Sequence, residues 1–241
     1  MYKLEDKKII FSNEQIFYDL KPISFGSLCD IYKIRIDKEV IALKLFNNLQ
    51  EQKIGNFERK LDISIDSYIF PVKLLYVNDK FRGYIMKFCK GKNLERRKLD
   101  ITVDEFASSV SKLVEDTEKL SKIRYNLYDT FLTNVMYDNG FKMIDTDDYI
   151  FEETKSISEI NTINTRRLNQ ILIDIFLKNT GLSTLYFSDV QFKKLIKKCE
   201  NGELLFEEIL NTLCMEAYNI ANCELEKISE VGKVLIKNKK I

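Results

Sequence analysis

The first part of the chain alternates apolar and polar residues in the manner of β-strands. Two such runs, Ile31–Ile36 and Val40–Phe46, are joined by the short polar turn DKE, which predicts a hairpin. Two further strands are expected in the segments FPVKLLYVND and FRGYIMKFCKG. Between the two pairs of strands, the stretch from Asn47 to about Leu61 is expected to be a helix, interrupted by Gly55.

Helical spacing of the apolar residues replaces this alternation later in the chain. Thr102 and Glu105 form the pattern of a capping box at the start of a helix with one apolar face. A second helix is expected over Asn161–Gly181, because glycine commonly ends a helix. A third helix is expected to open at Ser188, with Gln191 as its capping partner, and the segment ELLFEEILNTLCMEAYNI continues the helical character.

These patterns predict an α+β protein with two lobes. Residues 1–88 are expected to form a lobe with an antiparallel β-sheet and one helix, and residues 89–241 a mainly helical lobe. The polar segment KGKNLERRKLD is expected to connect them. The lysine-rich segment KISEVGKVLIKNKKI is expected to be a solvated end rather than a binding site.

The composition narrows the chemistry available to the chain. Its 241 residues include no histidine, which excludes Ser–His and Cys–His nucleophile pairs and the common zinc sites. The five cysteines form no CxxC pair and are expected to be reduced. The net charge of +1 gives no reason to expect a nucleic-acid partner. No apolar run approaches a membrane span, and the start MYKLEDKK is unlike a signal peptide, so we expect a cytoplasmic location.

One of the expected strands carries a lysine among apolar residues. Because side chains alternate across a strand, Ala42 and Lys44 share one face, and Ile41, Leu43 and Leu45 share the other. Lys44 is either a functional group or an edge lysine whose ammonium reaches water, and this strand alone does not decide between them.

The segment NLYDTFLTNVMYDNGFKMIDTDDYI places several Asp and Asn residues around a tight turn. The pair Asn139-Gly140 favours a two-residue type I′ turn, because both positions require positive φ. A turn there brings Asn134 opposite Asp145. One carboxylate and one amide oxygen suit Mg²⁺, whose remaining positions are filled by water and phosphate.

Asp129 lies five residues before Asn134, close enough to serve the same site. The alternative is that Asp129, Asn134 and Asp145 only cap turns, as Asp and Asn often do.

These residues resemble a known family. The segment YDTFLTN followed by FKMID is similar to the catalytic loop and metal-binding segment of the protein-kinase-like superfamily. The resemblance implies an ATP- and Mg²⁺-dependent phosphotransferase with a bilobal fold. It makes Asp129 the catalytic base, makes Asn134 and Asp145 the metal ligands, and makes Asp147 a possible further ligand.

Other motifs of that superfamily occur in the expected order. VIALK is similar to the strand whose lysine holds the α- and β-phosphates, which gives that role to Lys44. ISFGSLCDIYK resembles the phosphate loop, with Gly26 as its middle glycine. Glu58 suits the glutamate that pairs with the lysine, and Glu51 is its competitor. GYIMKFCKGKNL resembles the last strand and hinge, so that nucleotide-binding residues are expected at Ala42, Met86, Phe88 and Cys89.

The departures from the family pattern are informative. Leu127 and Tyr128 replace the His-Arg pair before the catalytic Asp, two loop glycines are replaced by Ser24 and Cys29, and no APE motif follows. These losses resemble small-molecule phosphotransferases of the aminoglycoside and choline kinase kind, and atypical bacterial or phage kinases. The acceptor, a protein or a small molecule, stays open. Two alternatives are a pseudokinase that binds nucleotide or acts as a scaffold, and a helical interaction protein without a nucleotide site.

Overall fold

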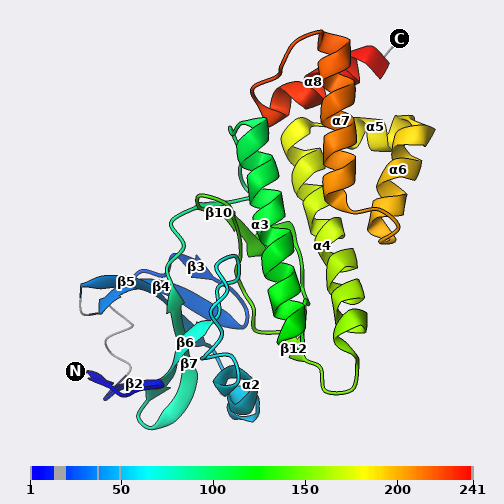
Figure 1. The fold of residues 1–241 in the computed structure, drawn as a ribbon. Helices are drawn as coiled ribbons and strands as arrows, with labels where there is room; N and C mark the ends of the chain where they lie inside the picture. Colours follow the sequence, from blue (N-terminus) through cyan, green and yellow to red (C-terminus); the bar gives the residue numbers. More distant parts are fainter. Residues whose placement is uncertain (1, 14–19, 37, 49, 240–241) are drawn as a thin grey trace. The chain divides into compact units, whose positions relative to one another are not determined.

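The computed structural model describes residues 2–13, 20–36, 38–48 and 50–239, and it is an α+β protein. The chain divides into two compact units (Figure 1). The first comprises Met1–Ser64 and Tyr68–Lys90, and the second comprises Ile65–Ser67 and Gly91–Ile241. The later division falls two residues after the boundary expected between residues 88 and 89.

The first unit contains a seven-stranded sheet with the order β1-β2-β6-β7-β5-β4-β3. The four strands expected from alternation are present in it, and β4 and β5 form the expected hairpin, with Ile36 opposite Glu39. The strands are β1 (Tyr2–Leu4), β2 (Lys8–Phe11), β3 (Ser24–Phe25), β4 (Cys29–Ile36), β5 (Glu39–Phe46), β6 (Pro71–Val77) and β7 (Lys80–Lys87).

The expectation of a purely antiparallel sheet is wrong, because β2 pairs with β6 in parallel. Ile9 lies opposite Leu75 and Phe11 opposite Val77, and all four side chains are buried. A parallel partner must come from a distant part of the chain. The local pattern of Lys8–Phe11 therefore says little about where this strand pairs, and burial of its apolar side chains decides it.

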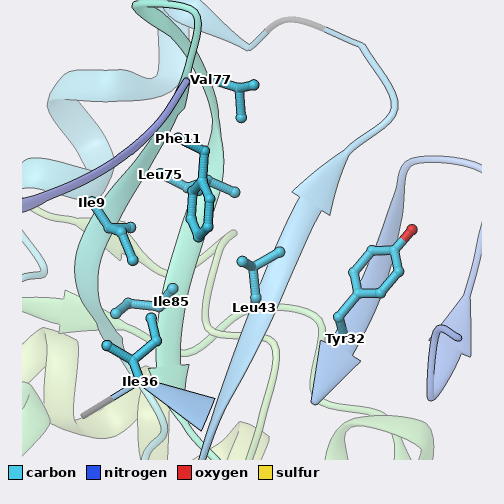
Figure 2. Packing of buried hydrophobic residues seen from close by; sticks show 8 residues of the cluster. All are labelled: Ile9, Phe11, Tyr32, Ile36, Leu43, Leu75, Val77 and Ile85. Atoms are coloured by element: carbon cyan, nitrogen blue, oxygen red, sulfur yellow. The ribbon is translucent and has the colours of Figure 1, made fainter. Parts of the chain in front are cut away.

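The sheet buries different side chains on its two faces. Tyr32, Leu43 and Ile85 are neighbours across three adjacent strands. They belong to an apolar cluster on one face, drawn in Figure 2 with its members Ile9, Phe11, Tyr32, Ile36, Leu43, Leu75, Val77 and Ile85. The alternation within β5 therefore assigns Leu43 to this cluster and Ala42 and Lys44 to the other face.

The other face packs against a short helix through aromatic rings. Phe57 of α2 (Ile54–Glu58) lies 5.3 Å from Tyr84 and 5.6 Å from Phe46, measured between ring centroids. The helix is preceded by the 3₁₀ turn η1 (Glu51–Lys53) and is shorter than the expected span from Asn47. Asn47 is used differently: its backbone N–H donates to Leu28 O at 3.0 Å, and its side chain donates to Gly26 O at 3.0 Å.

The second unit contains the expected helices and two small sheets, ordered β11-β10-β8 and β12-β9. The helix expected from Thr102 is confirmed as α3, with the capping box of Thr102 and Glu105. The helices are α3 (Val103–Lys122), α4 (Ile157–Thr180), α5 (Ser183–Ser188), α6 (Val190–Glu200), α7 (Phe206–Ala221) and α8 (Ile228–Lys239), and the strands are β8 (Lys92–Asn93), β9 (Tyr125–Asn126), β10 (Val135–Tyr137), β11 (Phe141–Met143) and β12 (Ile150–Phe151).

Helix α4 begins earlier than expected and ends where expected. Ser156 and Glu159 form a capping box in front of Ile157, and Gly181 ends the helix with a φ of 77°. The left-handed conformation is favourable for glycine because it has no Cβ atom, and this is why Gly181 marks the end of the helix correctly.

The segment expected to be a solvated lysine-rich end is instead a packed helix. Ile228, Val231 and Leu235 of α8 are buried, with at most 1% of each side chain exposed. At Gly232 a Cβ atom would lie 2.0 Å from Thr180 O, so α8 passes very close to the end of α4. None of the described helices combines the length and apolar character needed to cross a membrane.

The expected capping box of Ser188 and Gln191 is wrong. Ser188 is the last residue of α5, and Asp189 caps α6 by accepting hydrogen bonds from the N–H groups of Gln191 at 2.8 Å and Phe192 at 3.0 Å. Both Ser and Asp are good N-caps, and only the turn between two helices places Asp189 in the capping position.

We predict that Asp189→Ala lowers the free energy of unfolding by about 1 kcal/mol, because two N–H groups at the start of α6 lose their acceptor. Ser188→Ala is the matched control and is expected to change this free energy by less than about 0.5 kcal/mol. Urea unfolding of both variants measures the difference. Equal losses would contradict the assignment of Asp189 as the cap.

A second prediction concerns Gly83, where β7 runs against β5. Gly83 has a φ of 151°, and a Cβ there would lie 1.9 Å from Lys44 O. We expect Gly83→Ala to lower the free energy of unfolding by about 2–4 kcal/mol, because the strands must separate. The control is Gly55→Ala, whose Cβ meets nothing within 4 Å, and which should leave stability unchanged or raise it by up to about 1 kcal/mol. Urea unfolding measures both variants, and an unchanged free energy of unfolding for Gly83→Ala would contradict the close approach of the two strands.

Candidate functional site

The hairpin of the second unit differs by one residue from the expected pairing. Val135 lies opposite Met143 and Tyr137 opposite Phe141, so residues 138–140 form a three-residue loop. Ile144 N–H donates to Asn134 O at 2.8 Å. Asn134 is therefore level with Ile144, and the expected position of Asn134 directly opposite Asp145 is wrong.

Burial explains why this register forms. Side chains opposite each other in an antiparallel pair lie on the same face. Val135, Phe141 and Met143 share the buried face, and the ring of Phe141 lies 5.5 Å from that of Phe106 in α3. The two-residue turn would have placed Asp138 beside Phe141 and moved Val135 to the other face. Exposing a buried valine costs about 1.5 kcal/mol or more, which outweighs a local turn preference.

Asp129 and Asn134 are in contact, as their spacing in the sequence suggested. Asn134 is the last residue of the 3₁₀ turn η2 (Leu132–Asn134). Its side-chain Nδ2 donates to Asp129 O at 3.0 Å and to Asp129 Oδ2 at 3.2 Å. The two hydrogen bonds fix the amide plane, so that Oδ1 is the atom of Asn134 left for a ligand. A metal ion would accept this geometry, because it needs the oxygen and not the nitrogen of the amide.

The two aspartates of the site share an unusual backbone conformation. Asp129 has a φ of 53° and Asp145 a φ of 60°, both in the left-handed region. Among residues with a side chain, Asn and Asp adopt this conformation at the least cost, and such residues are often found at functional sites. Asp145 follows Ile144, whose N–H donates to the backbone oxygen of Asn134, so Asp145 comes directly after the residue paired with Asn134. Asp147 lies two residues further on, beyond the buried Thr146.

A buried amide on α4 holds the segment that leads to Asp129. Asn164 is fully buried, and its Oδ1 accepts a hydrogen bond of 2.7 Å from Leu127 N–H. Its Nδ2 donates to Tyr125 O at 2.8 Å and to Ser121 Oγ at 3.0 Å. This amide therefore joins α4, the end of α3 and β9, and it sets the point at which the loop containing Asp129 begins.

A groove of about 630 Å³ lies beside Asp129 in the second unit. The rings of Tyr128 and Phe131 on its rim are exposed, and the guanidinium of Arg167 lies 5.3 Å from the centroid of the Tyr128 ring. Loss of solvent raises the pKa of the Asp174 carboxyl in the groove wall, and the neighbouring Glu200 raises it further. The groove thus places aromatic, cationic and acidic groups next to Asp129.

In the first unit, Lys44 is buried beside two other residues assigned to the nucleotide site. Only 4% of Lys44 is exposed, and its Nζ lies 5.7 Å from the centroid of the Tyr84 ring. Ala42 lies opposite Met86 on the same face of the sheet. The alternative of an edge lysine whose ammonium reaches water does not agree with this burial, because β5 lies between β4 and β7.

The loop that resembles a phosphate loop is a tight hairpin tip. Gly26 is exposed between β3 and β4, and its N–H donates to Cys29 O at 3.0 Å. A Cβ at Gly26 would make an ordinary contact of 3.5 Å with Cys29 O. The loop conformation itself therefore does not require glycine here, and close approach of a ligand stays a prediction for this residue.

The remaining residues assigned to the nucleotide site lie at the ends of elements. Glu58 is the exposed last residue of α2, on the face of the sheet that carries Lys44, and its pairing with Lys44 stays a prediction. Phe88 and Cys89 follow the end of β7 and are half-buried, and the ammonium of Lys33 lies 4.7 Å from the centroid of the Phe88 ring.

Sequence reasoning missed the residues that support the site from a distance. Asn164 and the groove residues Arg167, Gln170 and Asp174 all lie on α4. Their spacing of three to four residues puts these polar groups on one stripe of α4. That stripe was the available signal, because a polar residue such as Asn164 that is buried must satisfy its hydrogen bonds or use them, whereas Gln170 and Asp174 are exposed.

Comparison with known proteins adds no identity to this geometry: no protein-family model matches the chain, and no curated protein matches it. Among the residues that the structure describes, no group of three or more Cys, Asp and Glu side chains forms a metal cluster. A site of the kind predicted here would use only Asn134 and one or two aspartates, with water and phosphate as further ligands.

We predict that Asn134→Asp destabilises the protein in a pH-dependent manner. The new carboxylate would lie beside that of Asp129, and repulsion raises the pKa of the pair in the folded state. The folded state then binds more protons than the unfolded chain, so the loss of about 1–2 kcal/mol in unfolding free energy at pH 7 should shrink as the pH falls through the raised pKa. Urea unfolding between pH 7 and pH 4 measures this.

The control is Asn134→Ala, which removes the same hydrogen bonds without adding a charge. Its loss of stability should change much less over the same pH range. A pH-independent loss for Asn134→Asp would contradict the contact between residues 129 and 134.

Proposed function

We propose that the protein is an ATP- and Mg²⁺-dependent phosphotransferase with a protein-kinase-like bilobal fold. The observation that carries the proposal is the contact of Asn134 with Asp129, while Asp145 directly follows Ile144, whose N–H donates to Asn134 O. Both aspartates have left-handed backbones, and a groove lies beside Asp129. Turn capping alone would not require the Asn134 amide to donate to both the backbone and the carboxylate of Asp129.

The chemistry asked of these residues needs no histidine. Bound Mg²⁺ would neutralise charge on the phosphates, and Asn134 Oδ1 and the carboxylate of Asp145 are the groups suited to hold it, with Asp147 as a further candidate. Asp129 would accept the proton of the acceptor hydroxyl as its oxygen forms a bond to the γ-phosphorus and ADP leaves.

The first unit would supply the positive charge for the remaining phosphates. Lys44 is buried on a central strand, so its side chain would lose little conformational entropy when a phosphate binds. Ala42 and Met86 lie on the same face and are suited to contact the adenine ring. Glu58 would orient the lysine, and Gly26 would let the loop approach the phosphates.

A pseudokinase that binds nucleotide without transferring phosphate is the second candidate. The exposed position of Glu58 and the tight turn at Gly26 favour it, because neither is engaged in a way that a working phosphate site requires. The two candidates agree on nucleotide binding and differ in turnover.

Thermal unfolding with MgATP and release of ADP together test the proposal. At saturating MgATP, about 100 times the dissociation constant, binding should stabilise the wild-type chain by about 2.7 kcal/mol and raise its melting temperature by about 5–11 °C. Asp129→Asn should keep this shift and lower turnover by about 100-fold or more, because asparagine retains an oxygen that can accept from Asn134 Nδ2 and lacks the basic carboxylate.

Asp148→Asn is the matched control, since Asp148 is exposed in the same segment and has no assigned role. It should leave both the shift and the turnover unchanged. If MgATP raises the melting temperature of the wild-type chain but no ADP is released, the pseudokinase remains as the function. If MgATP does not raise the melting temperature, both candidates are overturned.

A further inference from the structure

Helix α6 carries a dense row of positive charge on one side. Between Val190 and Cys199 the sequence has four lysines and no acidic residue. All four are exposed, and they line a shallow groove of about 370 Å³, whose members are Val190, Lys193, Lys194, Lys197, Lys198, Asn201 and Glu203. Their spacing places them on one face, while Phe192, Ile196 and Cys199 are buried on the opposite face.

Exposed apolar side chains stand at the start of this row. Phe187, at the end of α5, is 83% exposed, and Val190 is 66% exposed. The ring of Phe187 lies 5.4 Å from that of Tyr186, and the ammonium of Lys193 lies 5.8 Å from the centroid of the Tyr186 ring. Phe187 and Lys193 therefore both contact the ring of Tyr186, so that one surface combines a charged row with an apolar tip.

Two acidic residues lie near this surface, Asp189 between Phe187 and Val190 and Glu203 at the other end of α6. The Asp189 carboxylate is at the start of α6, but it is used in capping Gln191 and Phe192. Glu203 lies in the groove at the far end of the helix, next to Asn201. In the first two turns of α6, Lys193, Lys194 and Lys197 outnumber the one carboxylate of Asp189, so this end of the helix keeps a net positive charge.

We propose that this α6 face binds the surface of an anionic phospholipid bilayer. Lysine ammonium groups would pair with lipid phosphates, while Phe187 and Val190 would enter the boundary between headgroups and acyl chains. A nucleic acid fits less well, because a polyanion that followed the helix would meet Glu203, and because an exposed aliphatic residue gains nothing from a phosphate backbone. The proposal does not depend on phosphotransfer by the second unit.

Co-sedimentation of the full chain with vesicles tests this inference. We expect binding to vesicles of equimolar phosphatidylcholine and phosphatidylserine, weak binding to phosphatidylcholine alone, and release by salt. The double variant Lys194→Glu with Lys198→Glu should lower the partition coefficient by about 20-fold or more, since each lysine contributes separately near the surface.

The matched control reverses two exposed lysines at the same spacing on α8, Lys233→Glu with Lys237→Glu. It has the same net charge and should change the partition coefficient by less than about threefold. Phe187→Ser should weaken binding by about threefold to tenfold, because it removes the apolar anchor, whereas Met215→Ser on α7, at a residue 57% exposed, should not.

Three results would overturn the proposal. Equal losses for the α6 and α8 variants would show attraction by net charge alone. Binding of single-stranded or duplex nucleic acid, but not vesicles, with the same sensitivity at α6 would assign the surface to a nucleic acid. Absence of vesicle binding by the wild-type chain, folded by circular dichroism, would remove the surface as a membrane contact.

Discussion

The side-chain amide of Asn164 is the interaction on which the geometry of the second unit depends. It is fully buried and satisfies three separate partners, on α3, on β9 and on the residue that follows β9. A buried amide without partners costs about 1–3 kcal/mol per group, so this position favours one arrangement of these elements over others. The loop with Asp129 starts two residues after Leu127, and its position follows from this arrangement.

The loop then closes on itself through Asn134. Because Asn134 Nδ2 donates to both the backbone and the carboxylate of Asp129, the loop and the start of the hairpin form one hydrogen-bonded unit. The apolar residues of the hairpin pack against α3 through Phe141 and Phe106, so the polar residues are carried on a buried support. Proposed catalysis by such a site would use pre-positioned groups, which is what phosphoryl transfer requires of a protein.

Local signals predicted the elements but not how they pair. Thr102 and Gly181 marked helix ends correctly, because their capping roles depend only on neighbouring residues. The alternation around Lys44 correctly separated the two faces of β5. Asp189 was missed as a cap because Ser188 is an equally good one by type, and the choice between them depends on how two helices meet.

The sequence alone determined the α+β class, most of the helices, the four central strands and the closeness of Asp129 to Asn134, because these follow from residue type and short spacing. Tertiary structure decided the rest. Burial of Val135, Phe141 and Met143 set the hairpin register, and burial of Ile9 and Phe11 set the parallel pairing of β2. The free energy gained by burying apolar side chains between distant segments is larger than a local turn preference. No local pattern contains the identity of a distant partner strand.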